Sequence, residues 1–424
     1  MQPTLSTDEL SAWIRLTLEP DLGPAQARTL LAGIGLPQDI YAMSTSSLAK
    51  FLPHDLARQL HLPPGAQIET AIARTLEWLG APNHHLITLA DPAYPRSLLD
   101  IHDPPLLLYV NGNPEHLARP MISIVGARSA TAAGVENAHA FAQYLAEQGW
   151  CVASGLALGI DAAAHRGALR AGQQGAGTVA ILGTGIDIVY PSQNRELAHQ
   201  IAQQGALISE FPLGTRAIPF QFPKRNRIVA GLSQGVLVVE AALQSGSLIT
   251  ARLALETGRE VFAIPGSIHS PLSRGCHALI RQGAKLVESG RDIHDELGLP
   301  KLGFAKPSLE GYSTNRKTEL AAKPASGQRS NNVPGGGPKS RPPLRRETPQ
   351  QATMHGETHA SPALNAKGPN AAVLAALGYD PVHLDTLQAR TQLDLGTLNS
   401  QLLELELNET IARLDDGRFQ RCRP

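Results

Sequence analysis

Residues 121–155 read MISIVGARSATAAGVENAHAFAQYLAEQGWCVASG, and this stretch decides the fold class. An apolar, β-branched run ends at Gly126, a helical stretch covers residues 134–149, and a second apolar run ends at Gly155. Such continuously apolar runs are typical of parallel strands that helices cover on both faces. The stretch therefore predicts a strand–helix–strand unit.

The same pattern repeats toward the C-terminus. Further apolar runs begin near residues 178, 206, 235 and 260, with helical stretches at 159–172 and 247–258 between them. Alternating strands and helices predict an α/β domain with a doubly wound, mostly parallel sheet. We expect this domain to span residues 81–300, with the segment 85–113 adding strand and loop structure.

Residues 1–80 predict a small helical domain. Ser6 or Thr7 can cap a first helix, and apolar residues then recur at helical spacing. The stretch LGPAQARTLLAGIG, residues 22–35, resembles one half of a helix-hairpin-helix unit of a SAM-like domain. An ordinary helical turn capped by Gly33 and Gly35 fits the sequence equally well.

The remaining residues predict a linker and a third domain. Residues 301–366 are rich in Gly, Pro, Ser and Gln and too poor in apolar side chains to offset the entropy of ordering, which predicts a disordered basic linker. Residues 367–424 show three helical stretches, a strand, an Asp-Gly turn and another strand, the plan of a winged helix. Its third helix is acidic, which favours protein contacts over major-groove recognition.

Bulk composition limits the possible partners. Of the 424 residues, 37 are Lys or Arg and 37 are Asp or Glu, so any positive field that attracts a polyanion must be local. The three cysteines lie far apart without a ligand pattern, so neither a disulfide framework nor a metal site is predicted. No signal peptide or membrane-spanning run is apparent, so we expect a cytoplasmic protein without membrane contact.

The loops that follow the predicted strands suit an anion. In open α/β sheets ligands bind at the carboxyl ends of the strands, where backbone N–H groups and helix N-termini supply donors. After the first strand come Gly126 and Arg128, and after the fifth come Ser245, Gly246 and Ser247. These loops predict a phosphate-binding rim, although a loop glycine by itself more often serves a tight turn.

Standard nucleotide and hydrolase motifs do not occur in the sequence. The stretch LGTGID has Ile188 where a dinucleotide fingerprint needs its third glycine, and there is neither a GxxxxGK[ST] loop nor a GxSxG elbow. Kinase, ATPase and α/β-hydrolase interpretations therefore lack their main support.

A basic cluster stands before a helical stretch in FPKRNRIVAGLS, residues 222–233. It consists of Lys224, Arg225, Asn226 and Arg227. If a helix begins near Arg225, this arginine shares the buried face of the helix and must pair with Glu210 or Glu240 or reach an external anion. Lys224 and Arg227 are then freer to meet phosphate.

Aromatic residues precede this cluster. Phe220 and Phe222 offer flat surfaces on which bases can stack. Cations interleaved with aromatic rings suit single-stranded nucleic acid.

Four carboxylates lie at strand ends or helix starts: Asp161, Asp187, Glu210 and Glu240. Two that face each other could run acid–base chemistry, but pairing with Arg128, Arg225 or Arg227 is the favoured interpretation. His165, in an Ala-rich helix, is expected to be a packed histidine.

Several of these motifs, in this order, resemble the DNA-processing protein A (DprA, or Smf) family. The match includes SIVGARSAT, ASGLALGIDAAAHRGAL, LGTGIDIVYPSQN, FPKRNRIVAGLS and EAALQSGSLITARLALETG, and it covers the whole predicted α/β domain. The resemblance implies an extended Rossmann fold that binds single-stranded DNA without a cofactor or catalysis, protects incoming strands in natural transformation and helps load RecA. It also implies homodimers formed through the Rossmann domain.

By motif, the resemblance implies that Gly126, Arg128, Lys224, Arg225, Asn226, Arg227, Ser245, Gly246 and Ser247 form the DNA-contact set. Members often carry a cation directly after the Tyr-Pro of the third loop, where this chain has Ser192, so that contact is open unless Arg195 substitutes. The alternative function is a nucleotide phosphoribohydrolase of the lysine-decarboxylase-like Rossmann group, with Glu240 as its candidate catalyst. The absence of a PGG sequence before Thr250 counts against it.

Overall fold

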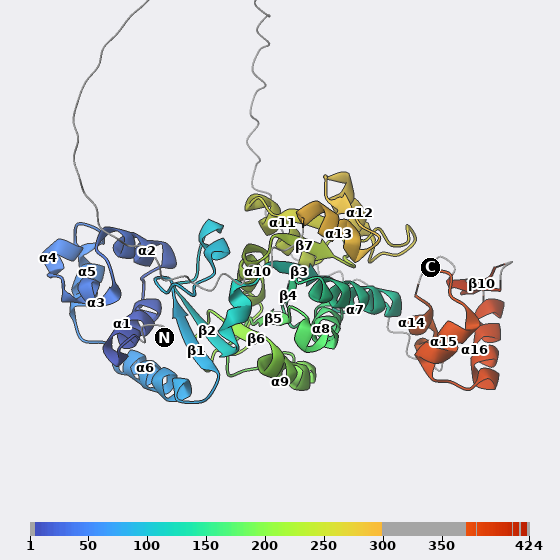
Figure 1. Ribbon diagram of the computed structural model, residues 1–424, viewed down its shortest axis with the longest axis horizontal. Helices are drawn as coiled ribbons and strands as arrows, with labels where there is room; N and C mark the ends of the chain where they lie inside the picture. The colour runs from blue at the N-terminus through green and yellow to red at the C-terminus, as the bar shows by residue number, and fades with distance from the viewer. Residues whose placement is uncertain (1–4, 299–369, 379, 409, 415–416, 422–424) are drawn as a thin grey trace, which may run out of the picture. The chain divides into compact units, whose positions relative to one another are not determined.

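The computed structural model describes residues 5–298 and 370–421, except 379, 409, 415 and 416. The chain begins with six helices, drawn in blue in Figure 1: α1 (Thr7–Leu18), α2 (Pro24–Gly33), α3 (Pro37–Ala42), α4 (Thr45–Leu48), α5 (His54–His61) and α6 (Ala66–Leu79). Ser6 caps α1 in a capping box with Glu9, as the sequence predicts. The sequence did not reveal the short helices α3 and α5.

These helices have their own core and also pack on the sheet. Leu16, Leu30, Leu48 and Leu60 are among the buried residues that join the helices to one another. Trp13 and Ile14 of α1 belong to a second cluster, together with residues of the sheet. The helical segment is therefore packed against the α/β part through α1.

A nine-stranded, mostly parallel sheet forms the centre of the α/β part. Its strands are β1 (His84–Thr88), β2 (Leu107–Gly112), β3 (Met121–Val125), β4 (Cys151–Ser154), β5 (Thr178–Ile181), β6 (Ala206–Ser209), β7 (Gly235–Val238), β8 (Glu260–Ala263) and β9 (Lys285–Leu286). The spatial order is β1-β2-β6-β5-β4-β3-β7-β8-β9, and only β2 runs against the other strands, pairing antiparallel with both β1 and β6. The predicted strands at 121, 151, 178, 206, 235 and 260 are confirmed.

Helices cover both faces of this sheet (Figure 1). They are α7 (Ala132–Glu147), α8 (Ile160–Arg170), α9 (Arg195–Gln204), α10 (Gln221–Leu232), α11 (Ser247–Glu256), α12 (Arg274–Arg281) and α13 (Gly290–Leu297). Helices α10, α11 and α12 share one cluster with one set of strand residues, and α7, α8 and α13 share another with the alternate set. Because successive strand side chains point to opposite faces, the two clusters are the two layers of a doubly wound fold.

The C-terminal residues form a winged helix, as the sequence predicts. Helices α14 (Ala371–Leu377), α15 (Leu384–Thr391) and α16 (Leu395–Leu407) precede the antiparallel pair β10 (Ile411–Arg413) and β11 (Phe419–Arg421). Val373, Leu387, Leu398 and Phe419 are buried together in its core. The predicted linker 301–366 lies outside the described residues. Among the described helices, none is both long and apolar enough to cross a membrane.

His165 is a fully buried histidine of α8, as the sequence predicts. Its Nδ1 lies 2.7 Å from Thr178 Oγ1, whose hydroxyl donates to the carbonyl of Val152, so the ring donates from Nδ1. Its Nε2 is buried without a partner in the described part of the chain. Burial is the largest cause that lowers the pKa of His165, to about 3, and the Arg225 charge adds to it.

This buried ring predicts that the protein loses stability in mild acid. Below its ordinary pKa of about 6.5 the histidine binds a proton in the unfolded chain but not in the folded chain, so the free energy of unfolding falls as pH falls. Between pH 7 and pH 5 His165 should account for about 2 kcal/mol. Urea unfolding at both pH values should show a smaller loss in His165→Asn, and an equal loss would contradict the assignment.

Candidate nucleic-acid interface

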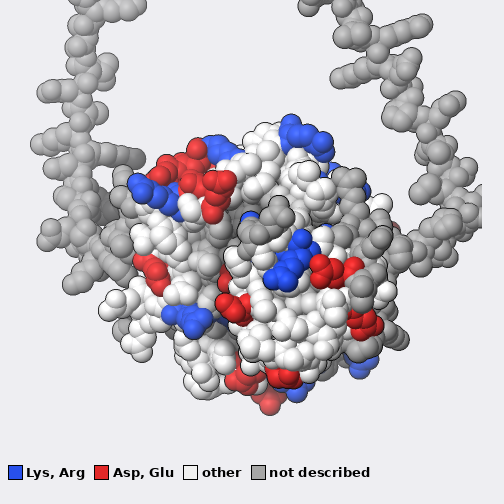
Figure 2. Space-filling view, turned by 90° about the vertical axis from the view of Figure 1, so that its right-hand side faces the viewer, with Lys and Arg blue, Asp and Glu red and all other residues white. Residues whose placement is uncertain are grey.

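The charges on the surface shown in Figure 2 are mixed. Basic and acidic side chains stand there in small groups among uncharged residues, without an extended field of one sign. This agrees with the equal numbers of cationic and anionic residues. Because the whole chain has no net charge, a site for an anion has to be built locally, from a few converging side chains.

The carboxyl edge of the sheet carries such a site. Strands β3 and β7 are neighbours in the sheet, although β4, β5 and β6 lie between them in the sequence. The loops after β3 and β7 therefore diverge at a topological switch point, where open α/β sheets form their ligand crevices. A pocket of about 540 Å³, here called the carboxyl-edge pocket, opens at this place. Seven of the predicted residues line it: Gly126, Arg128, Arg225, Asn226, Ser245, Gly246 and Ser247.

Arg128 is the exposed cation of this pocket. Its guanidinium carbon lies 5.7 Å from the centroid of the Phe222 ring, within cation–π range. The Phe222 ring lies in turn 5.5 Å from the ring of Tyr190, which is 49% exposed. Phe220, just before α10, is 67% exposed. The pocket thus presents a cation beside the half-buried Phe222 ring, with the exposed Tyr190 ring next to Phe222.

Arg225 lies at the base of the pocket instead of reaching out of it. Helix α10 begins at Gln221, one turn earlier than the sequence suggested, and Arg225 is 5% exposed. Its Nη1 donates to the carbonyls of Gly155 and Ile181, at the ends of β4 and β5. The expected partners Glu210 and Glu240 are not its partners. Burial lowers the pKa of Arg225 to about 10, although the nearby Asp161 opposes the shift.

The loop after β4 is shaped around this arginine. A side chain at Gly155 would collide with the Arg225 guanidinium and would have to displace it from the carbonyls that it binds. The Asp161 carboxylate accepts hydrogen bonds from the backbone N–H groups of Gly155 and Ala157, at 3.1 and 3.3 Å. Burial raises the pKa of Asp161, and the Arg225 charge opposes that shift. Asp161 also lines the pocket.

Lys224 and Arg227 lie outside this pocket, on another side of α10. Arg227 is ion-paired with Glu210, and its Nη2 lies 3.6 Å from an Asp103 carboxylate oxygen. Its side chain is only 13% exposed, so the expectation that Arg227 is free for phosphate is wrong. Lys224 lies 3.9 Å from Glu210 and is 42% exposed. Burial raises the pKa of Glu210, and Arg227 and Lys224 oppose that shift.

The loop before α11 closes the other side of the pocket. Ser245 Oγ lies 2.7 Å from Ser247 Oγ and accepts a hydrogen bond from the Ser247 N–H at 3.3 Å. Asn226 Nδ2 donates to the Gly246 carbonyl at 3.5 Å. Gly126 lies under the opposite wall, where a Cβ would stand 2.6 Å from Ile160. The serines are thus partly engaged with one another, and the Asn226 amide bridges α10 to their loop.

The remaining carboxylates stabilise loops, but not always through arginine. Glu240 accepts from the Thr131 N–H at 3.0 Å and from its hydroxyl at 2.6 Å, and burial raises the Glu240 pKa. Asp187 accepts from the Gly214 N–H at 2.9 Å. The predicted pairing with an arginine is confirmed for Glu210, whereas Glu240 is bound by a threonine.

Some residues that the sequence singled out do not line the pocket, and some residues that line it were not predicted. Neither Ser192 nor Arg195 is among the described residues that line it. Thr250 and Gln244 line it without having been predicted. Thr250 follows Ser247 by three residues on α11, so the helical spacing was a signal that could have revealed it.

The family model described as DNA recombination-mediator protein A matches residues 85–298, and a model described as the DprA winged helix domain matches residues 357–417. The protein Smf of Escherichia coli is 46% identical over 228 residues, which are 54% of this chain and 60% of that protein.

Two further matches cover more of the relative. The protein Smf of Synechocystis is 36% identical over 345 residues, 80% of each chain. The X-ray structure of DNA processing protein A from Streptococcus pneumoniae is 34% identical, with a TM-score of 0.58 over 70% of this chain and 99% of that chain. The chain therefore belongs to the DNA recombination-mediator protein A family, which includes the proteins named DprA and Smf.

Proposed function

We propose that this protein is a recombination mediator that binds single-stranded DNA at the carboxyl-edge pocket. The observation that carries the proposal is the convergence of Arg128, Asn226 and the loop 245–247 beside the Phe222 ring. Cations and amides suit the phosphates, and exposed aromatic rings suit unpaired bases, because every base has a face that can stack. Membership of a recombination-mediator family supports the same role.

The residues divide this work among themselves. Arg128 supplies the exposed charge, and Asn226 with the loop 245–247 supplies hydrogen-bonding groups. Arg225 is a positioning residue, because its guanidinium is bound to strand-end carbonyls under the pocket. In this proposal the protein binds without cofactor or catalysis. The alternative phosphoribohydrolase gains no specific support, since Glu240 is engaged by Thr131.

Finer parts of the proposal rest on the family. We carry over the loading of RecA onto the bound strand, the protection of incoming DNA during natural transformation or DNA processing, and a homodimer formed through the Rossmann domain. We also carry over the division into residues 1–80, 81–300, 301–366 and 367–424. In this division residues 81–300 bind the single-stranded DNA, and the acidic winged helix makes contacts with other proteins.

Replacing Arg128 tests the site. Arg128→Ala should weaken binding of a short fluorescent oligothymidylate by roughly 10-fold or more, because a charge-assisted hydrogen bond is lost. The slope of log affinity against log salt should fall by about 0.7, since one fewer phosphate is neutralised. Fluorescence anisotropy at several salt concentrations measures both. Arg170→Ala, at an exposed position near the end of α8, is the control, and unchanged affinity and slope in Arg128→Ala would contradict the assignment.

Replacing Arg227 should affect stability instead of affinity. Arg227→Met leaves Glu210 buried without its main partner, so the free energy of unfolding should fall by about 3–5 kcal/mol. The double variant with Glu210→Gln should recover part of this loss, because no unpaired charge stays buried. Urea unfolding and anisotropy are measured on the same samples. A large loss of DNA affinity at an unchanged free energy of unfolding would instead show that Arg227 contacts the DNA strand.

The mediator role has its own test. On strands precoated with a single-strand-binding protein, the full-length chain should shorten the lag of RecA filament formation, and Arg128→Ala should not. Filament growth can be followed by RecA ATP hydrolysis. If the wild-type chain binds the strands but leaves the lag unchanged, strand binding stands and RecA loading is excluded.

A further inference from the structure

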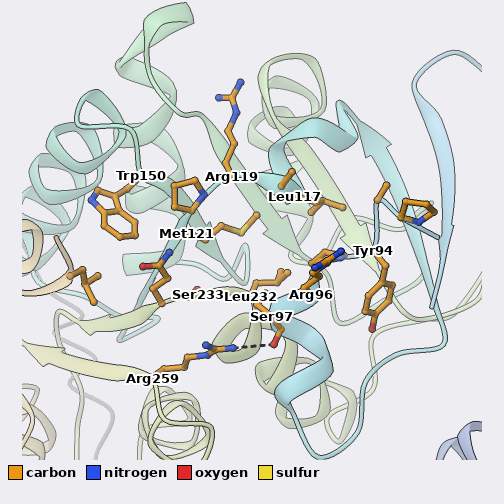
Figure 3. A pocket seen from close by; sticks show the side chains of 17 residues that line it. Tyr94, Arg96, Ser97, Leu117, Arg119, Met121, Trp150, Leu232, Ser233 and Arg259 are labelled. Carbon is orange, nitrogen blue, oxygen red and sulfur yellow. Dashed lines mark hydrogen bonds between the residues drawn. The ribbon is translucent and has the colours of Figure 1, made fainter. Parts of the chain in front are cut away.

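A second pocket opens at the opposite, amino edge of the sheet (Figure 3). It has a volume of about 710 Å³ and is here called the amino-edge pocket. Met121 begins β3, Trp150 precedes β4 and Gln234 precedes β7, so the pocket lies where the parallel strands start. Trp150 and Met121, both 1% exposed, belong to its buried floor.

Three arginines line this pocket, and no acid does among the described residues. Arg96 is exposed at the start of the 3-10 helix η1 (Arg96–Asp100), and no ion pair joins it to another described residue. Arg119 donates its Nη1 to the Ala176 carbonyl at 2.8 Å, and no acid in the described ranges forms an ion pair with it. Arg259 donates to the Ser97 carbonyl and pairs with Asp100 at 2.8 Å. The pocket is therefore electropositive, chiefly through Arg96 and Arg119.

The arrangement of these arginines suits an extended anion. Figure 3 shows Arg96, Arg119 and Arg259 at separate points around the pocket, on different segments of the chain, instead of converging on one spot. Such a dispersed arrangement suits a single phosphate less well than a longer anion. A chain of several negative charges can meet more than one.

Helix α11 connects the two pockets. Its first residue, Ser247, lines the carboxyl-edge pocket, and Arg259, three residues after its end, lines the amino-edge pocket. Ten residues of helix span about 15 Å. Between the pockets the exposed side chains of α11 are Ile249, Arg252, Leu255 and Glu256. Like the two pockets, this surface combines a cation with apolar side chains. Glu256 is the one acid among these four residues.

We propose that a single strand held at the carboxyl-edge pocket continues over α11 and places further phosphates in the amino-edge pocket. The inference rests on the proposed function, because the strand must enter at Arg128. Continuity along α11 favours a nucleic-acid strand over an acidic peptide, which would need only the amino-edge pocket. The site then spans both edges of the sheet.

Strand length is the variable that tests this proposal. Anisotropy is measured for oligothymidylates of about 3 and about 30 nucleotides, since at about 3.4 Å per stacked nucleotide a trimer is shorter than the about 15 Å of α11. Arg96→Glu and Arg252→Glu should each weaken the long oligomer about threefold or more and lower its salt slope by about 0.7. Their affinity for the short oligomer should stay within about twofold of wild type. Arg170→Glu, near the end of α8 on the other face of the sheet, is the matched control.

A second measurement locates the strand directly. A photo-crosslinking amino acid at the exposed position Gln234 should capture the long oligomer and not the short one. Length-independent losses in Arg96→Glu, or affinities equal to the Arg170→Glu control, would overturn the extended site while leaving the carboxyl-edge pocket intact. Crosslinking of a polyglutamate peptide but no oligomer would overturn it in favour of an acidic peptide. Absence of binding by the wild-type chain at either length would overturn the proposed function as well.

Discussion

The buried guanidinium of Arg225 is the interaction on which the carboxyl edge depends. It ties α10 to the carbonyls that end β4 and β5, and it does so from a position that is 5% exposed. Removing a charge from water is costly, so the contact persists only because carbonyl oxygens and the nearby Asp161 compensate it. The guanidinium also fills the space that a side chain at position 155 would occupy, and so it shapes the loop after β4.

This anchor sets the rotation of α10 and so gives the basic cluster two roles. With Arg225 turned toward the sheet, Asn226 lies at the carboxyl-edge pocket, whereas Lys224 and Arg227 lie with Glu210 beside residues of α1 and α2. A pocket of about 220 Å³ is lined there by residues of both segments. Helix α10 thus contributes Asn226 to the candidate anion site and Arg227 to an ion pair with Glu210, which lies next to α1 and α2.

The sequence predicted the parts of this structure that local patterns encode. Apolar runs ending in Gly, Ala or an acid marked six strands, and the loops after them brought Arg128 to the loop 245–247 because parallel strands end at one edge. The choice of partner for Arg227 could not be predicted. An arginine at a loop edge suits an acid or a phosphate equally, and only the helix start at Gln221 and the approach of Asp103 decide between them. The amino-edge pocket was missed because its residues come from segments between positions 92 and 297, with no common motif.

The equal numbers of acidic and basic residues limit how such a protein can hold a polyanion. At physiological salt a charge acts over about 8 Å, so a cluster at one edge of the sheet barely influences a phosphate at the other. A strand is then bound by the sum of short-range contacts along its path, and not by one broad field. Under this constraint, an additional exposed cation along the path, such as Arg252, increases the affinity only for DNA strands that are long enough to reach it. A chain without net charge would in this way favour long single strands over short fragments.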